Sequence, residues 1–340
     1  MKRLKILALM HDVLVPPEDV SGHNLATVDW KMEFDVTVTL KDMGHDVRCL
    51  GVDNKLQLIR ETVLDWRPHI VLNMVEDFFN IPTFDVNFVG YLELLRVPYT
   101  GCNPRGLHLG RDKALSKKIL AYHDIPVPRC AVFPQGRKVR SGRDFEFPVI
   151  VKAQVKEASA GISQASVVDS EAKLVDRVGF MHHQIGGDAV AEQYIEGRQL
   201  YVGVIGNKKL RVFPIWEMLF NNWPEGIHKI ATGSVKFSPV YQKKRGITTA
   251  RAADIPKSLA RRIQRACADA YRALDLSGYA RIDVRLTADG EFYILEANPN
   301  PQLAFGEDFA ESAEHDGLSY EELLQKILNL GLSYRPDHRG

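Results

Sequence analysis

The chain has little cysteine and no long apolar run. Four cysteines occur among its 340 residues, and none forms a CxxC pair, so the sequence indicates neither a zinc knuckle nor a disulfide framework. Lys5 interrupts the apolar N-terminal segment, and His11 and Asp12 follow it at once, which leaves it too short for a signal peptide. No stretch approaches the length that crosses a bilayer. We therefore expect a cytoplasmic protein without a membrane partner.

An excess of charge of either sign is also missing. Lys and Arg total 44 against 43 for Asp and Glu, a net charge of +1, which gives no global attraction to nucleic acid. The hydrophobic fraction of 45% and the charged fraction of 26% are typical of a globular protein. A chain of this length exceeds one ordinary core, so we expect two or three domains. Small-molecule partners fit these features best.

Short apolar runs alternate with helical periodicity in the first part of the chain. This βαβαβ pattern predicts a mostly parallel sheet with helices on its faces. The segment after the first run, HDVLVPPEDVSGHN, lacks the GxGxxG pattern, which disfavours a dinucleotide-binding Rossmann domain. The predicted strands are 6–10, 47–52 and 70–75, and the predicted helices are 30–43, 56–66 and 85–95.

Clustered proline and glycine near VPYTGCNPRG mark the first domain boundary. We expect domains at 1–101, 102–195 and 196–332, and a frayed tail at 333–340. The second range has predicted helices at 111–123 and 170–178 and strands at 130–133, 149–153, 164–168 and 189–194. The third has predicted strands at 200–205 and 210–216, a long loop at 217–239, a helix, a hairpin and a terminal helix.

The hairpin is the most informative segment. In GYARIDVRLTADGEFYILEANPNP, two runs of alternating residues are joined by Asp-Gly, a strong turn signal. If Asp289 and Gly290 form a two-residue turn, Asp283 lies opposite Glu296 and Arg281 opposite Asn298, all on one face. Like charges directly opposite one another are destabilising unless something compensates them.

A divalent cation is the natural compensator. Two carboxylates and an amide oxygen suit Mg²⁺ (or Mn²⁺), which completes its shell with water and substrate phosphates. We therefore predict Asp283, Glu296 and Asn298 as metal ligands, with Arg281 as a catalytic residue that stabilises developing negative charge. The alternative is a solvated face on which Arg281 neutralises the acids.

The order of the motifs extends this interpretation over almost the whole chain, from Ile6 to Leu328. RIDVRL followed by EANPNP resembles the metal-binding end of the ATP-grasp superfamily, and the wider chain resembles its D-alanine-D-alanine ligase branch. VPYTG, RDKALSKKILAYHDIPVP, FPVIVKAQVKEASAGIS and VAEQYIEGRQLYVGVIGN follow in the family's order. The resemblance implies an ATP-grasp fold of mixed α/β and α+β type, in which an N-terminal Rossmann-like parallel-sheet domain precedes two α+β domains that clasp ATP.

The resemblance also implies an ATP site. Two lysines at strand or helix ends would offset phosphate charge, a loop of small residues would offer backbone N–H groups to the phosphates, and AEQYIEG would form the adenine-binding hinge. Gln199 stands where the family commonly has a ribose-binding glutamate. The residues predicted to bind the nucleotide are Lys113, Lys152, Ser159, Ala160, Gly161, Glu192, Gln193, Tyr194, Ile195 and Gln199.

The implied reaction forms an amide bond. A substrate carboxylate attacks the γ-phosphate of ATP, and an amine then displaces phosphate from the acylphosphate. The loop at 217–239 resembles a closing loop that excludes water and carries Lys236 as a second catalytic residue, although an ordinary surface loop is equally compatible with its composition.

The substrate-binding segments depart from the family. MHDVLVPPEDVSGHN replaces a glycine- and serine-rich loop whose glutamate holds the first substrate's amine, and Glu18 is a candidate substitute. Gln302 stands where a glycine turn is usual, and NMVED replaces a histidine-glycine pair, so Asn73 and Glu76 are further candidates. For Asn73 and Glu76, buried capping of a strand end is the alternative.

Three alternatives to D-alanine ligation stay open. One is a ligase for a different dipeptide or a modified peptide, one is a noncatalytic nucleotide-binding module, and one is a phosphotransferase. Amino acids or peptides are the expected substrates of a ligase, and the resemblance also implies a homodimer.

Overall fold

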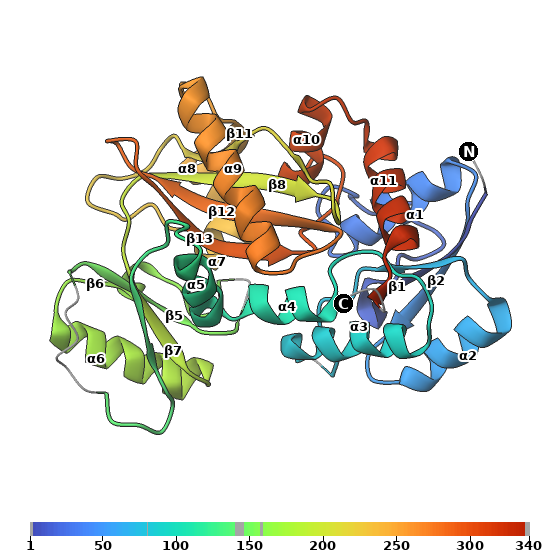
Figure 1. Cartoon of the computed structure of the whole chain (residues 1–340), viewed down its shortest axis with the longest axis horizontal. Helices are drawn as coiled ribbons and strands as arrows, with labels where there is room; N and C mark the ends of the chain where they lie inside the picture. Colours follow the sequence, from blue (N-terminus) through green and yellow to red (C-terminus); the bar gives the residue numbers. More distant parts are fainter. Residues whose placement is uncertain (1–2, 80, 140–145, 157–158, 337–340) are drawn as a thin grey trace.

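The computed structural model describes residues 3–79, 81–139, 146–156 and 159–336, which form three sheets with helices packed against them (Figure 1). The first sheet is parallel, in the order β2-β1-β3, and its central strand is buried because helices cover it. The sheet and its helices comprise β1 (Lys5–His11), α1 (Lys31–Asp42), β2 (Asp46–Val52), α2 (Leu56–Trp66), β3 (Ile70–Asn73) and α3 (Asp85–Leu94). This confirms the predicted parallel sheet with crossover helices.

Two short helices connect the first sheet to the second. They are α4 (Pro104–Arg111) and α5 (Lys113–Tyr122), whereas the sequence pattern predicts one helix over 111–123. The prediction missed α4 because proline and glycine obscured its start, which Asn103 caps by accepting a 2.9 Å hydrogen bond from the N–H of Gly106. Asp112 separates the helices and caps α5.

The second sheet is antiparallel, in the order β4-β7-β5-β6, with α6 (Glu171–Phe180) packed on it. Every residue of β5, VIVKA, is buried, including Lys152. The predicted strand at 164–168 is wrong over Gln164–Ser166, which form a 3₁₀ turn. The strands are β4 (Cys130–Phe133), β5 (Val149–Ala153), β6 (Val167–Val168) and β7 (Ala189–Gln193).

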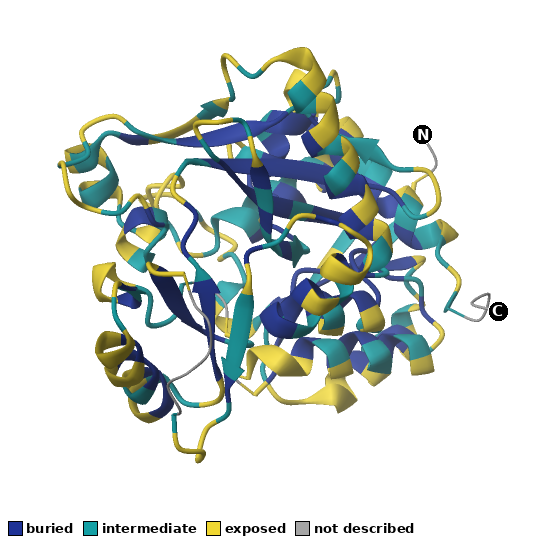
Figure 2. Cartoon of the chain, turned by 60° about the vertical axis from the view of Figure 1, so that its left-hand side comes forward, coloured by how far each residue is buried: buried dark blue, intermediate teal, exposed yellow. Residues whose placement is uncertain are grey.

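The third sheet is antiparallel, in the order β11-β10-β8-β12-β13, with β9 paired to β8. Its strands are β8 (Arg198–Ile205), β9 (Arg211–Val212), β10 (Trp216–Phe220), β11 (Ile247–Arg251), β12 (Tyr279–Leu286) and β13 (Phe292–Pro299). Figure 2 shows that the middle strands are buried and that loops at the rim are exposed. Its helices and those that follow are α7 (Gly233–Phe237), α8 (Pro239–Arg245), α9 (Lys257–Ala273), α10 (Asp308–His315) and α11 (Tyr320–Ser333).

Three predicted elements of this region need correction. The strand expected over 210–216 is interrupted at Pro214, which has no N–H to donate to a ladder. The loop expected over 217–239 begins inside β10, contains α7, whose start Thr232 caps, and ends at the first residue of α8. The tail expected at 333–340 begins with the last residue of α11, and the Tyr334 ring lies 5.7 Å from that of Tyr99, while 337–340 lie outside the described residues.

The hairpin of β12 and β13 has the predicted register, but its turn differs from the predicted one. The N–H of Thr287 donates to the carbonyl of Glu291 at 2.8 Å, so a three-residue loop, not the predicted two-residue turn, joins β12 and β13. A β-bulge at Leu295 then adds one residue to β13. The two differences cancel, so Asp283 lies opposite Glu296 and Arg281 opposite Asn298 as predicted.

The first sheet shares a core with the end of the chain. Residues of β1, β3 and α1 pack with residues of α10 and α11 in one buried cluster that includes Ile6, Leu40, Ile70, Leu323 and Leu328. Figure 1 shows α11 beside α1. Among the residues that the structure describes, every helix is too short or too polar to cross a bilayer. The sheets fall one in each predicted domain range, and the boundaries themselves stay predictions.

Candidate active site

A cavity lies between the second and third sheets. It is bounded by the ends of α5 and β5, the loop after β5, α7 and the hairpin strand β13. Four lysines face one carboxylate around it, so it attracts anions. The lining residues are Lys113, Lys152, Ala153, Lys156, Ser159, Ala160, Ile162, Lys236, Glu296 and Asn298. Seven of these residues are site residues predicted from the sequence. The other three, Ala153, Lys156 and Ile162, were not predicted.

A capping interaction brings the two predicted phosphate lysines together. Lys113 is the first residue of α5, and Lys152 lies near the end of β5. Asp112 caps α5 and also accepts hydrogen bonds of 3.0 Å from the amide of Gln154, two residues after Lys152. The ammonium of Lys113 donates to the carbonyl of Lys156 at 2.9 Å. The helix start and the strand end are therefore held in fixed relation.

Lys152 belongs to a buried group of three charges. Its Nζ lies 2.9 Å from Glu192 Oε2, and the Nζ of Lys117 lies 2.9 Å from Glu192 Oε1. Burial raises the pKa of Glu192, but the two lysines outweigh it and the pKa is lowered overall. Burial likewise lowers the pKa of Lys152, but Glu192 and Glu296 raise it overall. Glu192 and Lys152 are therefore charged at neutral pH.

The structure gives Glu192 contacts that the sequence did not predict. Its side chain is fully buried and pairs with the two lysines. The place of Glu192 and Gln193 near an adenine amine stays a prediction. The signal that could have revealed these ion pairs is the position of Glu192 within β7, on the strand that pairs with the strand of Lys152.

The middle of the hinge is apolar and buried. Tyr194 and Ile195 are buried, and Tyr194 packs with Ile150 and Ile230. Burial raises the pKa of the Tyr194 phenol, so it is neutral at physiological pH. Gln199 is buried on β8, opposite Arg285 of β12. These positions are compatible with a base pocket at the hinge, and their roles stay predictions.

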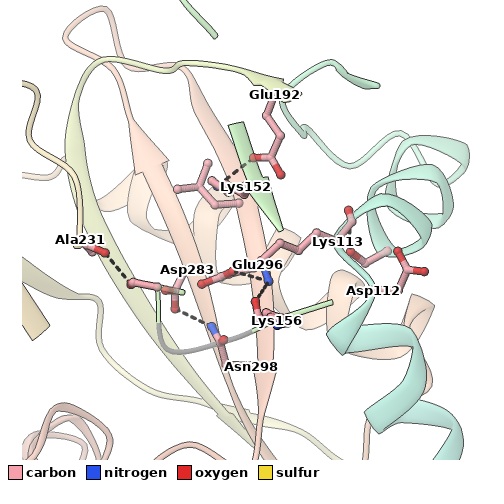
Figure 3. Close-up of polar contacts among 12 residues, drawn as sticks. Asp112, Lys113, Lys152, Lys156, Glu192, Ala231, Asp283, Glu296 and Asn298 are labelled. Atoms are coloured by element: carbon pink, nitrogen blue, oxygen red, sulfur yellow. Dashed lines mark hydrogen bonds and ion pairs between the residues drawn. The ribbon is translucent and has the colours of Figure 1, made fainter. Parts of the chain in front are cut away.

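The loop of small residues lies beside the phosphate lysines. Ser159 and Ala160 line the cavity, and Ser159 Oγ donates to the carbonyl of Ala231 at 2.6 Å (Figure 3). Gly161 has φ +71°, and a Cβ there would lie 2.7 Å from the Ile185 side chain, so glycine is required. Gly161 does not line the cavity, and its carbonyl accepts a hydrogen bond from Arg177.

On the hairpin, Arg281 lies between two carboxylates. Its Nε is 2.9 Å from Asp283 Oδ1, and its Nη1 is 3.2 Å from Asp308 Oδ2. The guanidinium also lies 4.5 Å from the centre of the Tyr201 ring. Asp308, at the start of α10, was not anticipated, because the sequence pattern did not reveal that helix. Arg281 is thus held rigidly beside the cavity.

The predicted metal ligands lie together. Asn298 Nδ2 donates to Asp283 Oδ1 at 3.0 Å, and Glu296 Oε2 is 3.9 Å from Lys113 Nζ (Figure 3). Burial raises the pKa of Glu296, but Lys113, Lys236, Lys152 and Lys117 together lower it to about 2. Burial and the nearby Glu296 raise the pKa of Asp283, against the effect of Arg281. Glu296 is therefore ionised, as a metal ligand must be.

These residues fit a hard divalent cation. Two carboxylates on paired strands repel each other, and a cation between them would relieve the repulsion. No group of three or more His, Cys, Asp or Glu residues within the described part of the chain is arranged to hold a metal. The predicted set contains only two carboxylates and an amide, which matches the few protein ligands that Mg²⁺ takes when phosphates supply others.

The candidate substrate residues are not brought together in the same way. Asn73 is buried at the end of β3, where its Oδ1 accepts a 3.1 Å hydrogen bond from the N–H of Val75. This contact matches the buried strand-end capping that was the alternative to substrate binding by Asn73. Glu18, Glu76 and Gln302 are exposed, and none of them lines the cavity.

A buried carboxylate near Glu76 was missed from the sequence. Glu33 on α1 is 1% exposed, and its Oε1 has no hydrogen-bond partner among the described residues. Burial, with a smaller contribution from Glu76, raises the pKa of Glu33 to about 7. Helical periodicity alone treats position 33 as one more polar residue of α1, which is why no signal marked it.

Solved structures show the class of fold. The D-alanine–D-alanine ligase from Bacillus anthracis complexed with ATP superposes with a TM-score of 0.73 at 20% identity, covering 96% of this chain and 97% of that one. This match confirms the ATP-grasp fold of mixed α/β architecture.

Sequence relatives show the family. The model for the D-ala D-ala ligase C-terminus matches residues 119–329, more than half of the chain. A D-alanine–D-alanine ligase from Desulforudis audaxviator is 32% identical over 253 residues, which cover 71% of this chain and 75% of that protein. An uncharacterized protein of Sinorhizobium fredii is 28% identical over 302 residues, 87% of this chain and 85% of that protein. The chain belongs to the D-alanine–D-alanine ligase family, as the motif order indicated.

Proposed function

We propose that this protein is an ATP-dependent carboxylate–amine ligase that forms an amide or peptide bond through an acylphosphate. One observation carries the proposal: four lysines converge on a single cavity whose opposite wall is the hairpin with Glu296 and Asn298. That distribution of charge suits a polyphosphate with its divalent cation. Amino acids are the substrate class that its family membership supports.

The proposed roles of the site residues follow from their charges. Lys113, Lys152 and Lys236 would hold phosphate oxygens, and Asp283, Glu296 and Asn298 would hold Mg²⁺ or Mn²⁺. When bound, the cation neutralises charge on the transferring phosphoryl group. Arg281, fixed by Asp283 and Asp308, would stabilise negative charge as the amine attacks the acylphosphate. No side chain needs to act as a nucleophile.

The first experiment is a substrate panel. Phosphate release from Mg-ATP is measured with D- and L-amino acids supplied singly and in pairs, and products are identified by mass spectrometry. Release that requires an amine, with a dipeptide product, supports the ligase. Phosphorylated product without an amine would indicate a phosphotransferase. Nucleotide binding without phosphate release over the whole panel would favour a noncatalytic module.

A second candidate is a ligase for a dipeptide other than D-alanyl-D-alanine, or for a modified peptide. The exposed Gln302, in place of the family's glycine turn, and the altered first loop with Glu18 favour it. In the panel, release with D-alanine alone would select the first candidate, and release only with another pair would select the second. The homodimer and the cytoplasmic location stay predictions from the sequence.

A further inference from the structure

Lys117 is a buried lysine outside the phosphate cavity. It lies one turn after Lys113 on α5, and it is 2% exposed. Lysine is seldom buried this completely unless it is paired. Its ammonium has two partners on two different elements, Glu192 of β7 at 2.9 Å and the carbonyl of Leu295 on β13 at 2.7 Å. A single side chain therefore joins the second and third sheets.

The first partner concerns the charge of the phosphate site. Glu192 is shared by Lys117 and Lys152, so the group of three carries one net positive charge next to the cavity. Without Lys117, the remaining carboxylate and ammonium would form a neutral pair. The Lys152 charge would then be balanced by Glu192 and would attract a phosphate less.

The second partner concerns the predicted metal ligands. Leu295 is the extra residue of the β-bulge, and that bulge sets Glu296 opposite Asp283. β13 is the edge of its sheet, so the carbonyl of Leu295 has no strand on that side to pair with. Lys117 supplies the missing donor, and the N–H of Ile294 donates to Pro126 beside it at 2.8 Å. The contact stabilises the bulge and hence the place of Glu296.

We propose that Lys117 is a positioning residue that acts on both halves of the site. It leaves the charge of Lys152 available to phosphate by sharing Glu192, and it fixes the β13 bulge that places Glu296. The inference rests on the proposed function, because it assumes that the cavity binds nucleotide and the hairpin binds metal. Lys117 does not line the cavity, and its contact with the hairpin is to the carbonyl of Leu295 and not to a predicted metal ligand.

Two binding measurements without amino acid substrate separate the two effects. Calorimetry with EDTA present gives the affinity for AMP-PNP, a nonhydrolysable ATP analogue. Electron paramagnetic resonance gives the affinity for Mn²⁺ when AMP-PNP is saturating. Thermal unfolding is measured for every variant. If the wild-type protein binds neither ligand, the proposed function fails, and the inference about Lys117 fails with it.

For Lys117→Met we expect AMP-PNP binding about tenfold weaker because one net charge is lost. We expect Mn²⁺ binding about 10- to 100-fold weaker, as for other groups that orient metal ligands. Lys118→Met is the matched control, because Lys118 is the exposed neighbour on the same helix, and it should change neither affinity. Wild-type affinities for both ligands in folded Lys117→Met would overturn the proposal.

Charge rescue distinguishes positioning from general stabilisation. In Lys117→Met/Glu192→Gln the net positive charge returns, so AMP-PNP affinity should recover to within about threefold of wild type, while Mn²⁺ binding stays weak. A purely structural role would leave both affinities low. If Lys117→Met does not fold, Glu192→Gln alone is decisive. It should strengthen AMP-PNP binding without metal, and weaker binding would overturn the charge argument.

Discussion

The two ends of the proposed active site are built differently. At the phosphate end, Lys113, Lys152, Lys236, Glu296 and Asn298 line one cavity. At the amino acid end, the candidates are a buried capping residue and exposed loop residues that do not line it. Strands and capped helices place the first set, whereas loops place the second. A regular scaffold thus fixes the chemistry of the nucleotide, and the loops leave the choice of amino acid open to change.

The largest effect is expected from substitutions at the phosphate end. Glu296→Gln and Asp283→Asn each remove one carboxylate from the predicted metal set, and each should lower metal-dependent phosphate release at least about 100-fold. Thermal unfolding should show that both variants fold. Glu291→Gln, an exposed residue of the same hairpin, is the control and should keep wild-type turnover. Turnover near wild type in both variants would remove the metal assignment.

A smaller effect tests the buried carboxylate near the amino acid end. Because the pKa of Glu33 is raised to about 7, the folded protein retains a proton that the unfolded chain loses near pH 4.5. The free energy of unfolding should therefore fall between about pH 4.5 and 7 and level off above it. Glu33→Gln removes this loss, and at pH 8 it should be more stable than wild type by roughly 1–3 kcal/mol.

The control for Glu33 lies on the same helix. Asp42→Asn, at an exposed position of α1, should leave the dependence of stability on pH unchanged. Unfolding is followed by denaturant titration at several pH values from 4 to 8. Equal curves for Glu33→Gln and wild type would mean that Glu33 is not protonated in the folded protein.

Asn73→Ala tests whether this capping residue at the amino acid end also contacts the substrate. The variant leaves the N–H of Val75 without its acceptor, and we expect a loss of about 1 kcal/mol in the free energy of unfolding. The KM for the amino acid substrate should stay within about twofold of wild type, because the amide faces the backbone. A large rise in that KM with unchanged stability would indicate that Asn73 binds substrate.

Gln302→Ala should have the smallest effect on stability, within about 0.5 kcal/mol, because the residue is exposed. Its informative readout is kinetic. If the second candidate function holds, the preference among second amino acids should change while the KM for ATP does not. An unchanged preference would show that Gln302 does not select the second amino acid.

Much of the phosphate end could be predicted from the sequence, because alternation along strands and the order of motifs are local signals. The register of Asp283 and Glu296 was predicted correctly, yet from a turn that the structure does not contain. The Leu295 bulge compensates for the longer loop, and no residue in EFYILEANPNP predicts that bulge. A bulge depends on what packs against the strand, here Lys117 from another sheet's helix.

The remaining errors have a common physical cause. The ion pairs of Glu192 were not predicted because its partners come from α5 and β5, far away in sequence. Glu33 was passed over because its burial depends on elements contributed by other parts of the chain. Asp308 was missed with α10. Local patterns predict elements, but they do not predict which polar side chain a distant element will cover.

The core shared by the first sheet and the last two helices has a consequence for biosynthesis. β1, β3 and α1 leave the ribosome well before α10 and α11, which share their core. The intervening stretch of about 230 residues takes roughly 10 to 45 s to translate. During that time Ile6, Leu40 and Ile70 lack the helices that bury them. The core around the first sheet is therefore completed only after α10 and α11 have been synthesised.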